Sequence, residues 1–359
     1  MADTISELIL SWYASHKRRL SFRGTGDPYR VLVSEFMLQQ TRADTAEAYF
    51  DRFVALFPDI SSLASAPVGA VLKAWEGLGY YARARNLRQA AVIIEDRYGG
   101  RVPGSARELV RLPGVGPYSA AAIASIAFGE RIPAMDGNLI RIFARLYDER
   151  GCVDREEVKR RLFSLALSAM PERECGDFNQ AMMDLGASVC VPGTPDCGVC
   201  PLESLCLAAR AGHPEFLPVK SKKKPPAQKY YAAVILRRGD RVCLVRRTEK
   251  MLNSLYVFLL VPLPGETADG EACAAAGGYL ARRFPLLSVS PLGEARHVFT
   301  HQVWNMKILL ARCDETAPET DGTFLWADME QLLALPMPGA MKAARSLALQ
   351  SLSADRPED

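Results

Sequence analysis

Four cysteines lie within seventeen positions in the stretch CVPGTPDCGVCPLESLC, residues 190–206, and this loop restricts the fold more than any other stretch. Cys190, Cys197, Cys200 and Cys206 are separated by six, two and five residues. Disulfides would need an oxidising compartment, but the first residues, MADTISELILSWYASHKRRL, lack the unbroken apolar core of a signal peptide. We therefore expect a cytoplasmic protein, in which so compact a group of cysteines most often binds a metal.

The spacing of these cysteines bears on which metal they bind. Zinc and iron–sulfur clusters both accept four thiolates, but zinc sites are usually built from two C-x2-C pairs. Here there is one such pair with two longer arms, which favours an iron–sulfur cluster and leaves zinc as the alternative. The other cysteines are scattered and are expected to be small buried residues: Cys152, Cys175, Cys243, Cys273 and Cys313.

Length and composition suit two domains. The chain has 359 residues, of which 49% are hydrophobic, enough to bury two cores. No apolar run approaches the roughly eighteen residues of a membrane helix, so no membrane partner is expected. The net charge is only +3, but basic residues cluster in HKRR (16–19), RARNLR (83–88) and KSKKK (220–224), which together suggest a polyanionic partner.

The first part of the chain shows helical patterns. Asp27 and Pro28 predict the start of a helix carrying VLVSEFMLQQ, and Pro58 predicts the end of the next one. Asp154 and Glu157 predict a capping box for VKRRLFSLALSAM.

The last part shows strand patterns. YYAAVILRRGDRVCLVRR predicts two strands around a Gly-Asp turn, and VWNMKILLARC alternates as a strand does. The change of pattern predicts a helical domain at 1–217, a basic linker at 218–228 and a second domain at 229–359.

The stretch LVRLPGVGPYSAAAI, residues 109–123, has the pattern of a helix-hairpin-helix motif, which we place at 109–128. Gly114 and Gly116 can take positive φ and expose backbone amides, and Pro117 opens a helix whose N-terminus carries partial positive charge. Such a turn can grip a DNA phosphate without reading the base sequence, although a plain turn between helices is the alternative. The residues assigned to DNA contact are Leu112, Gly114, Val115 and Gly116.

Three features together resemble the endonuclease III superfamily of base-excision DNA glycosylases. They are this hairpin, Asp136 in AMDGNLIRIFARL, and the cysteine loop after FNQAMMDLGASVC. Within that superfamily, SEFMLQQT (34–41), GLGYYARARNL (77–87) and NQAMMDLGA (179–187) are similar to the adenine DNA glycosylase family. The resemblance covers nearly the whole first domain and implies an all-α helix-hairpin-helix glycosylase domain with a [4Fe-4S] cluster in the cysteine loop.

The resemblance also implies catalytic roles. Breaking a purine N-glycosidic bond needs an acid at the base and an anion near the sugar. Glu35 has apolar neighbours that would raise its pKa and suit it to the acid role, whereas composition alone would make it an exposed helical residue. Asp136 is expected to cap a helix and to face the forming cation as a carboxylate. Asn138 would orient water or Asp136.

Tyr118 separates two reaction types within the superfamily. Bifunctional members carry at this position a lysine that forms a Schiff base with the sugar. Tyr118 therefore implies a monofunctional glycosylase that leaves an abasic site. Simple aromatic packing is the alternative role for Tyr118.

Base extrusion and adenine binding are assigned by the same resemblance. Gln40 and Tyr80 match positions that wedge into the base stack, and Gln180 matches one that contacts the extruded adenine. Arg23 is also assigned to the adenine pocket. Phe22 stands where the family usually has Trp, a departure that keeps the aromatic face.

The second domain resembles an α+β Nudix-like module that recognises 8-oxoguanine. In HVFTHQVWNM, residues 297–306, a turn would present Phe299, Thr300 and His301 to the lesion, with Thr300 standing where Ser is common. EACAAAGGYLARRF holds one acid instead of the Glu-rich magnesium helix of Nudix hydrolases, so binding without hydrolysis is expected. MLNSLYVFLLVP lacks the usual Leu-Trp and Phe-Pro pairs.

The implied function is removal of adenine mispaired with 8-oxoguanine, or with guanine, in base excision repair. The expected partner is double-stranded DNA holding A:8-oxoguanine or A:G mispairs. The protein is expected to bind it as a monomer at a bacterial nucleoid. Two alternatives are an endonuclease III-like lyase acting on oxidised pyrimidines and a non-catalytic, cluster-bearing DNA-binding protein. Tyr118 argues against the first alternative, and Glu35 with Asp136 argues against the second.

Overall fold

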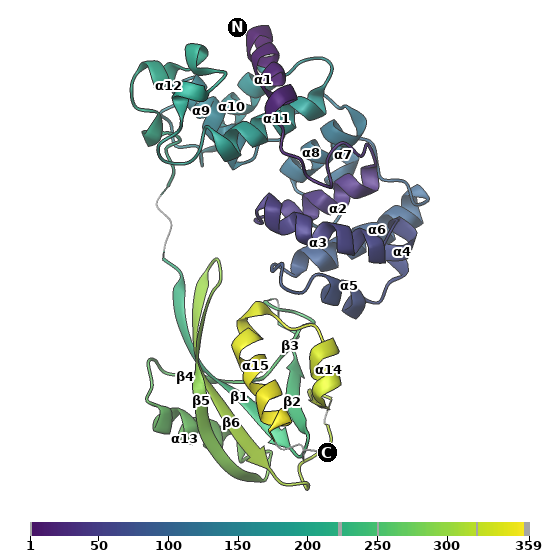
Figure 1. Ribbon diagram of the computed structural model, residues 1–359, viewed down its shortest axis with the longest axis vertical. Helices are drawn as coiled ribbons and strands as arrows, with labels where there is room; N and C mark the ends of the chain where they lie inside the picture. Colours follow the sequence, from purple (N-terminus) through teal and green to yellow (C-terminus); the bar gives the residue numbers. More distant parts are fainter. Residues whose placement is uncertain (1, 222–224, 250, 321, 355–359) are drawn as a thin grey trace. The chain divides into compact units, whose positions relative to one another are not determined.

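The computed structural model describes residues 2–221, 225–249, 251–320 and 322–354. Its contacts divide the chain into two units: residues 1–66 with 83–223, called here the helical unit, and residues 67–82 with 224–359, called the sheet unit. Figure 1 shows helices in the first and a sheet flanked by helices in the second. The expected order, an all-α part followed by an α+β part, is confirmed. Residues 222–224 of the expected linker lie outside the described residues.

The helical unit contains eleven of the α-helices found in the described residues. They are α1 (Ala2–His16), α2 (Pro28–Leu38), α3 (Ala43–Leu56), α4 (Ile60–Ser65), α6 (Ala82–Tyr98), α7 (Ala106–Leu109), α8 (Pro117–Phe128), α9 (Gly137–Leu146), α10 (Glu156–Ala169), α11 (Cys175–Ser188) and α12 (Leu207–Arg210). Three 3-10 turns follow α11: η1 (Cys197–Val199), η2 (Glu203–Leu205) and η3 (Pro214–Phe216). None of the helices in the described part of the chain is long and apolar enough to cross a membrane.

The N-termini of two helices, α2 and α10, test the capping residues that the sequence predicts. Asp27 caps α2 by accepting from the amide of Tyr29, with Pro28 at the first helical position, as predicted. The predicted capping box before α10 is wrong, because the cap residue is Arg155 and it makes no side-chain bond. Asp154 instead accepts bonds from the amide and hydroxyl of Ser221, so a contact distant in sequence replaces the local one.

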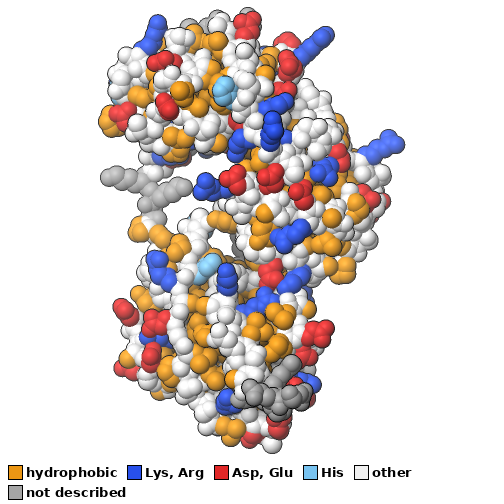
Figure 2. Space-filling view, in the orientation of Figure 1, with side chains coloured by type: hydrophobic (Ala, Val, Ile, Leu, Met, Phe, Trp, Pro, Cys, Tyr) orange, Lys and Arg blue, Asp and Glu red, His pale blue; other side chains and the backbone are white. Residues whose placement is uncertain are grey.

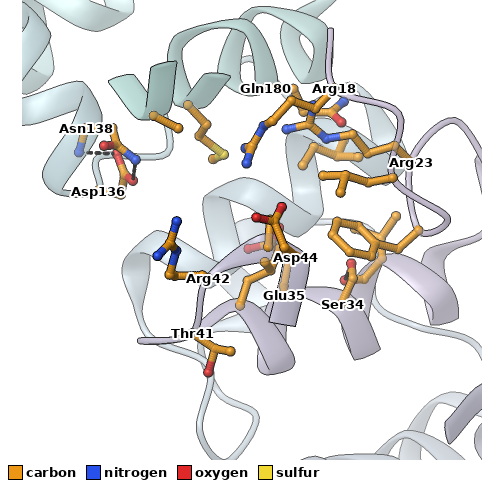
Figure 3. Close-up of a pocket in the computed structure, with 18 of the residues that line it drawn as sticks. Arg18, Arg23, Ser34, Glu35, Thr41, Arg42, Asp44, Asp136, Asn138 and Gln180 are labelled. Atoms are coloured by element: carbon orange, nitrogen blue, oxygen red, sulfur yellow. Dashed lines mark hydrogen bonds between the residues drawn. The ribbon is translucent and has the colours of Figure 1, made fainter. Parts of the chain in front are cut away.

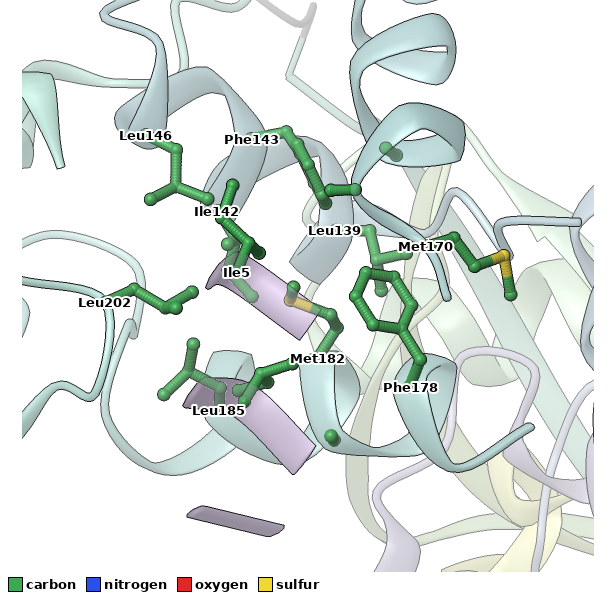
Figure 4. Packing of buried hydrophobic residues seen from close by; sticks show 14 of the residues in the cluster. Ile5, Leu139, Ile142, Phe143, Leu146, Met170, Phe178, Met182, Leu185 and Leu202 are labelled. Atoms are coloured by element: carbon green, nitrogen blue, oxygen red, sulfur yellow. The ribbon is translucent and has the colours of Figure 1, made fainter. Parts of the chain in front are cut away.

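One large core sits between α1, α9, α10 and α11, and Figure 4 shows its packing. Phe143 of α9 and Phe178 of α11 are fully buried there, and Ile5 and Ile9 of α1 pack against them. Leu202, from the cysteine loop, also belongs to this core. Burial of an apolar side chain stabilises a fold by about 1.5–3 kcal/mol, so this core helps to fix both α9 and the part of the cysteine loop that carries Leu202.

The sheet unit is built on a mixed seven-stranded sheet with the order β3-β2-β1-β6-β5, where β4 also pairs with β1 and β7 with β2. The strands are β1 (Ala227–Arg238), β2 (Arg241–Arg246), β3 (Tyr256–Val257), β4 (Leu259–Leu263), β5 (Leu286–Val298), β6 (Gln302–Cys313) and β7 (Phe324–Ala327). β1 and β6 run parallel, and the other pairs are antiparallel. The predicted hairpin around Gly239 and Asp240 is confirmed as β1 and β2.

Both faces of this sheet are buried, which gives the unit three layers. Trp304, Met306 and Ile308 of β6 face one core, while Leu309 and Ala311 face the other. Helix α13 (Asp269–Leu280) covers the second face, and the first is covered by α14 (Met329–Ala334), the turn η4 (Gly339–Met341) and α15 (Lys342–Ser353). The alternation in β6 therefore separates two cores and not a core from solvent.

Residues 67–82, which carry the short helix α5 (Val68–Ala74), belong to the sheet unit although they come from the first quarter of the chain. Glu76 forms an ion pair of 2.7 Å with Arg345 and accepts from the amide of Met337. The hydroxyl of Tyr81 donates to the carbonyl of Met337 at 2.9 Å. Polar contacts with α15 and the segment before it thus join this stretch to the sheet unit.

Much of the clustered basic charge has partners inside the protein. Arg83 is buried and donates to the carbonyls of Phe36, Met37 and Gln39 at the end of α2. Arg88 donates to the carbonyl of Ala66. On the face drawn in Figure 2, Lys and Arg side chains are mixed with Asp and Glu over both units. Basic residues of the run at 83–88 therefore bind backbone carbonyls inside the protein, so not all of this run is available to a polyanionic partner.

Candidate active site

A cavity of about 440 Å³ lies within the helical unit. Its walls come from the segment between α1 and α2, from α2, α8 and α11, and from the starts of α3 and α9. Figure 3 shows Glu35 on one side of this space, Arg18, Arg23 and Gln180 on another, and Asp136 with Asn138 at a third. The structure thus gathers in one cavity residues that the sequence assigns to acid chemistry, sugar stabilisation and adenine binding.

Glu35 lies on α2 and is only 3% exposed. Its Oε2 has no hydrogen-bond partner among the described residues. Burial raises the pKa of Glu35 to about 7, while the nearby Tyr118 hydroxyl and Arg23 act to lower it and Asp136 to raise it. A carboxyl of this kind is partly protonated near neutral pH and can donate its proton to a bound base.

Asp136 caps α9, as predicted, and its carboxylate is held by three bonds. Its Oδ1 accepts from the amides of Asn138 and Leu139 at 2.8 Å, and its Oδ2 accepts from the Asn138 side chain at 2.8 Å. Burial raises the pKa of Asp136, and these same bonds oppose that rise. The expected orienting contact between Asn138 and Asp136 is therefore present in the geometry.

Tyr118 stands at the second position of α8 and lines the same cavity. Burial, followed by the charges of Glu35 and Asp136, holds the pKa of its hydroxyl well above the usual value. The hydroxyl also lies 3.9 Å from the sulfur of Met183. No lysine is among the described residues that line this cavity, so they offer no side-chain amine to a sugar bound there.

Arg23 and Gln180 line the cavity as the sequence suggested, and the structure adds Arg18 and Asp184. Arg23 binds the Asp184 carboxylate through two nitrogens, at 2.5 and 2.9 Å. Arg18 lines the cavity beside it and binds the same carboxylate. Asp184 lies four residues after Gln180 on α11, so both side chains fall on one helix face. That spacing is a sequence signal that could have pointed to Asp184.

The hairpin joins α7 to α8 as predicted, but its two glycines differ. Gly114 has φ +79°, whereas Gly116 has φ −85° and caps α8 without needing the left-handed region. A Cβ on Gly114 would lie 2.7 Å from Cβ of Asn86 and 2.8 Å from Cε1 of Phe36. The Gln39 side chain also donates to the Gly114 carbonyl, a contact that sequence reasoning missed.

The side chains of Leu112 and Val115 are buried, so these residues can offer only backbone groups to a ligand. Gly116 is exposed at the start of α8, whose free amides attract anions.

Gln40 and Tyr80, the two residues assigned to wedge into DNA, share an unusual backbone. Gln40 has φ 58° and Tyr80 has φ 49°, in the left-handed region that side chains other than glycine rarely adopt. Gln40 is exposed just after α2, and Tyr80 is 49% exposed. Residues held in this conformation cost about 1–3 kcal/mol and cluster at functional sites.

The four cysteines of 190–206 line one small cavity together with Arg145. Arg145 is fully buried and donates to Sγ of Cys190 at 3.3 Å, and its own carbonyl accepts from Cys206. Burial raises the pKa of the Cys200 thiol to about 12, and the charges of the other three cysteines act in the same direction. No group of three or more His, Cys, Asp or Glu side chains within the described ranges is gathered as a metal site.

The lining of this cavity, four thiols beside the Arg145 cation, is chemically suited to an iron–sulfur cluster, because thiolates are the ligands of such a cluster and the cation offsets their negative charge. Cys152, Cys175, Cys243, Cys273 and Cys313 lie outside this cavity. Cys175, Cys243 and Cys313 are buried as expected, whereas Cys152 and Cys273 are only partly buried, so the expectation is wrong for these two.

A chain of contacts joins the cysteine loop to the carboxylate in the cavity. Arg141 on α9 donates to the carbonyl of Cys190 at 2.7 Å and to Oδ1 of Asn138 at 2.8 Å. Asn138 in turn holds Asp136. The position of the loop is therefore coupled through two side chains to Asp136.

In the sheet unit, Phe299, Thr300 and His301 form the turn between β5 and β6. The amide of Phe299 donates to the carbonyl of Gln302 and closes the turn, and the Phe299 ring packs at 5.0 Å against Trp304. Thr300 and His301 are exposed. The Thr300 hydroxyl lies 3.0 Å from the Tyr80 hydroxyl. Tyr80, which the resemblance assigns to base extrusion, and Thr300, which it assigns to lesion recognition, therefore contact each other within the sheet unit.

Comparisons with known proteins agree with this arrangement. Residues 33–166 match the model of the HhH-GPD superfamily of base excision DNA repair proteins, and residues 231–346 match that of the NUDIX domain. The adenine DNA glycosylase of Buchnera aphidicola (subsp. Acyrthosiphon pisum) is 37% identical over 255 residues, covering 70% of this chain and 73% of the relative. That of Mus musculus is 32% identical over 366 residues, covering 87% and 71%.

Solved structures resemble the helical part. A thermostable thymine-DNA glycosylase aligns with a TM-score of 0.54 and 29% identity, covering 58% of this chain and 97% of its own. Endonuclease III in a non-covalent DNA complex aligns with a TM-score of 0.50 and 23% identity, covering 58% and 94%, which indicates a shared fold. From the cavity, the hairpin and these relatives together, the chain belongs to the adenine DNA glycosylase family of the HhH-GPD superfamily.

Proposed function

We propose that this protein is a monofunctional DNA glycosylase that excises adenine mispaired with 8-oxoguanine or guanine and leaves an abasic site. The observation that carries the proposal is Glu35, buried with one oxygen unpartnered and facing a cavity that also holds Asp136. A buried acid opposite a carboxylate is what cleavage of an N-glycosidic bond requires. Relatives that are named adenine DNA glycosylases support adenine as the base.

In this mechanism Glu35 donates its proton to the leaving adenine, and Asp136 faces the positive charge that develops on the sugar. Water then forms the new bond to the sugar carbon and releases one proton, which leaves free adenine and an abasic site. Asn138 and the first amides of α9 hold the Asp136 carboxylate in place. Tyr118, which lines the same cavity, would lie beside the sugar. The absence of a lysine among the described lining residues supports hydrolysis without a Schiff base and therefore without strand cleavage.

Adenine must leave the duplex before Glu35 can reach it. Gln40 and Tyr80 would enter the vacated stack, since both are exposed and both have a backbone in the left-handed region. The amides of Gly114 and Gly116 at the start of α8 would bind a backbone phosphate. Arg23 and Gln180 would contact the base in the cavity.

The turn of the sheet unit would read the opposite base. Thr300 and His301 are exposed and polar, which suits hydrogen bonds to 8-oxoguanine, while Phe299 supports the turn through Trp304. Helix α13, from Asp269 to Leu280, has acids only in its first turn, which supports binding without hydrolysis.

Cys190, Cys197, Cys200 and Cys206 would hold a [4Fe-4S] cluster. With four thiolate ligands such a cluster leaves no open position for water, and it would supply a rigid support for the loop. Iron and sulfide analysis of the purified protein tests this assignment, and zinc without iron would overturn it. We further propose that the protein acts as a monomer at the nucleoid and that its functional boundaries follow residues 1–217, 218–228 and 229–359, except that residues 67–82 belong with the second domain.

One duplex assay tests the proposed reaction. The protein is incubated with DNA holding adenine opposite 8-oxoguanine, and strand breaks are compared with and without hot alkali. Breaks that require alkali, together with free adenine, support a monofunctional glycosylase. Breaks without alkali indicate a lyase, and binding without any breaks indicates a non-catalytic DNA-binding protein.

A further inference from the structure

Asp184 is a buried carboxylate that the mechanism above does not use. It lies on α11, its side chain is 1% exposed, and it accepts four bonds from two arginines. Its Oδ1 accepts from Nε of Arg18 at 2.6 Å and from Nη2 of Arg23 at 2.9 Å. Its Oδ2 accepts from the backbone amide of Arg18 at 3.1 Å and from Nη1 of Arg23 at 2.5 Å.

The two arginines come from a segment without regular structure. Residues 17–27 join α1 to α2 and contain Gly24 and Gly26, both with positive φ. This segment nevertheless supplies Arg18, Phe22 and Arg23 to the wall of the cavity. A helix offers a more rigid base than an irregular segment, so four bonds to α11 restrict where the two guanidinium groups can lie.

The charges around Glu35 give Asp184 a second effect. Arg18 and Arg23 bring two positive charges to the cavity, and Asp184 leaves one of them uncompensated. The Arg23 charge acts to lower the pKa of Glu35, against the larger effect of burial. The other groups around the cavity are Tyr118 on α8, Asp136 before α9, and the exposed Arg42 and Asp44 at the start of α3.

We propose that Asp184 is a positioning residue, which fixes Arg18 and Arg23 in the wall of the excision cavity and cancels one of their two positive charges beside Glu35. The inference rests on the proposed function, because the excision rate is its main readout. Its chemistry is that of a buried carboxylate shared by two guanidinium groups, in which Arg23 binds through both terminal nitrogens and Arg18 through Nε and its backbone amide.

The test is single-turnover excision of adenine opposite 8-oxoguanine, measured from about pH 5.5 to 8.5. Asp184→Asn should slow excision, and its rate should decline at lower pH than in the wild type. The reason is that a second uncompensated positive charge favours ionised Glu35, so the defect grows about tenfold for each pH unit by which the decline moves. Asp177→Asn is the matched control, because Asp177 lies exposed on the same helix. It should leave the rate and the pH profile unchanged.

A double variant separates charge from position. Arg18→Gln combined with Asp184→Asn restores the net charge of the group without restoring the bonds to Arg23. The pH of the decline should return to the wild-type value while the rate stays reduced. Titration of Glu35 followed by 13C NMR gives a readout without turnover, in which Asp184→Asn should lower the pKa of Glu35.

Two results would overturn the proposal. One is Asp184→Asn with the wild-type rate and profile, and the other is a uniformly lower rate with an unmoved pH profile, which is what a packing defect alone produces. If Asp184→Asn does not fold, Asp184→Glu keeps the charge and lengthens the arm, and a wild-type rate in that variant would overturn the positioning role. Absence of excision by the wild type would instead refute the proposed function, while the NMR titration would still decide the role of Asp184.

Discussion

The excision cavity and the turn at 299–301 place their polar groups in opposite surroundings. Glu35, which lines the cavity, and Asp184, which binds Arg18 and Arg23 of its wall, are both buried, and the pKa of each departs from its usual value, upward for Glu35 and downward for Asp184. In the turn, Thr300 and His301 are exposed, and the apolar support comes from Phe299 against Trp304. Desolvation makes a carboxyl a proton donor at neutral pH, whereas a group that reads a base edge must reach out of the fold. We therefore expect the same kind of small substitution to act very differently in the two regions.

The largest expected effect is in the cavity. Glu35→Gln removes the proton donor but keeps the shape of the side chain, so excision should fall by about 10²–10⁴-fold. Duplex binding should persist, because the hairpin and the wedge residues are untouched. The measurement is single-turnover excision beside a gel-shift titration, with Glu7→Gln on the exposed face of α1 as the control. An excision rate in Glu35→Gln equal to that of the wild type would contradict the role of Glu35 as proton donor.

The next effect concerns pH. Since burial raises the pKa of Glu35 from 4.5 to about 7, the folded protein binds this proton more tightly than the unfolded chain does. That stabilisation is fully present below about pH 4.5 and is lost as pH rises through about 7, on the order of 3 kcal/mol. Glu35→Gln should therefore raise the melting temperature relative to the wild type more at about pH 8 than at about pH 5. Equal shifts at both pH values would contradict the burial argument.

A third effect should separate the two glycines of the hairpin. Gly114→Ala places a Cβ against Asn86 and Phe36 and strains a positive φ, so unfolding should become easier by about 1–3 kcal/mol and duplex affinity should fall. Gly116→Ala meets nothing within 4 Å and should leave the melting temperature nearly unchanged. Denaturant titration and gel shift of both variants test this. Similar losses of stability in the two would show that the close approach at Gly114 does not matter.

The smallest effect is expected in the turn. Thr300→Val removes the hydroxyl that pairs with Tyr80, a bond between exposed groups worth about 0.5–1.5 kcal/mol. Preference for 8-oxoguanine over guanine opposite adenine should drop by about two- to tenfold, with little change in excision from A:G. Thr300→Ser, which keeps the hydroxyl, is the control and should retain the preference. A loss as large as that of Glu35→Gln would erase the contrast between the regions.

The sequence predicts the parts of this molecule that depend on local pattern. The cap at Asp27, the helix after Pro117 and the hairpin at Gly239 follow from capping and turn residues, and the cavity residues Glu35, Asp136 and Tyr118 follow from a family resemblance. Composition alone would have left Glu35 as an exposed helical residue, and the family resemblance was needed to place it in a site.

What the sequence does not predict depends on contacts between distant segments. Asp154 bonds to Ser221 in place of capping α10, and Arg83 closes the end of α2 in place of meeting a polyanion. Asp184 finds Arg18 and Arg23 more than 160 positions earlier in the chain, as the separations of 166 and 161 residues show. No local pattern encodes such pairs, because the free energy that selects them arises only when the helices pack.

The stretch 67–82 has a consequence for engineering this protein. Glu76 and Tyr81 bind Arg345 and Met337, so a cut at 218–228 would not release a self-contained C-terminal cassette. In a chimera with an unrelated domain after that point, Glu76 and Tyr81 would lose their partners Arg345 and Met337. A new lesion specificity would therefore require exchanging both segments of the sheet unit together, residues 67–82 and residues 224–359.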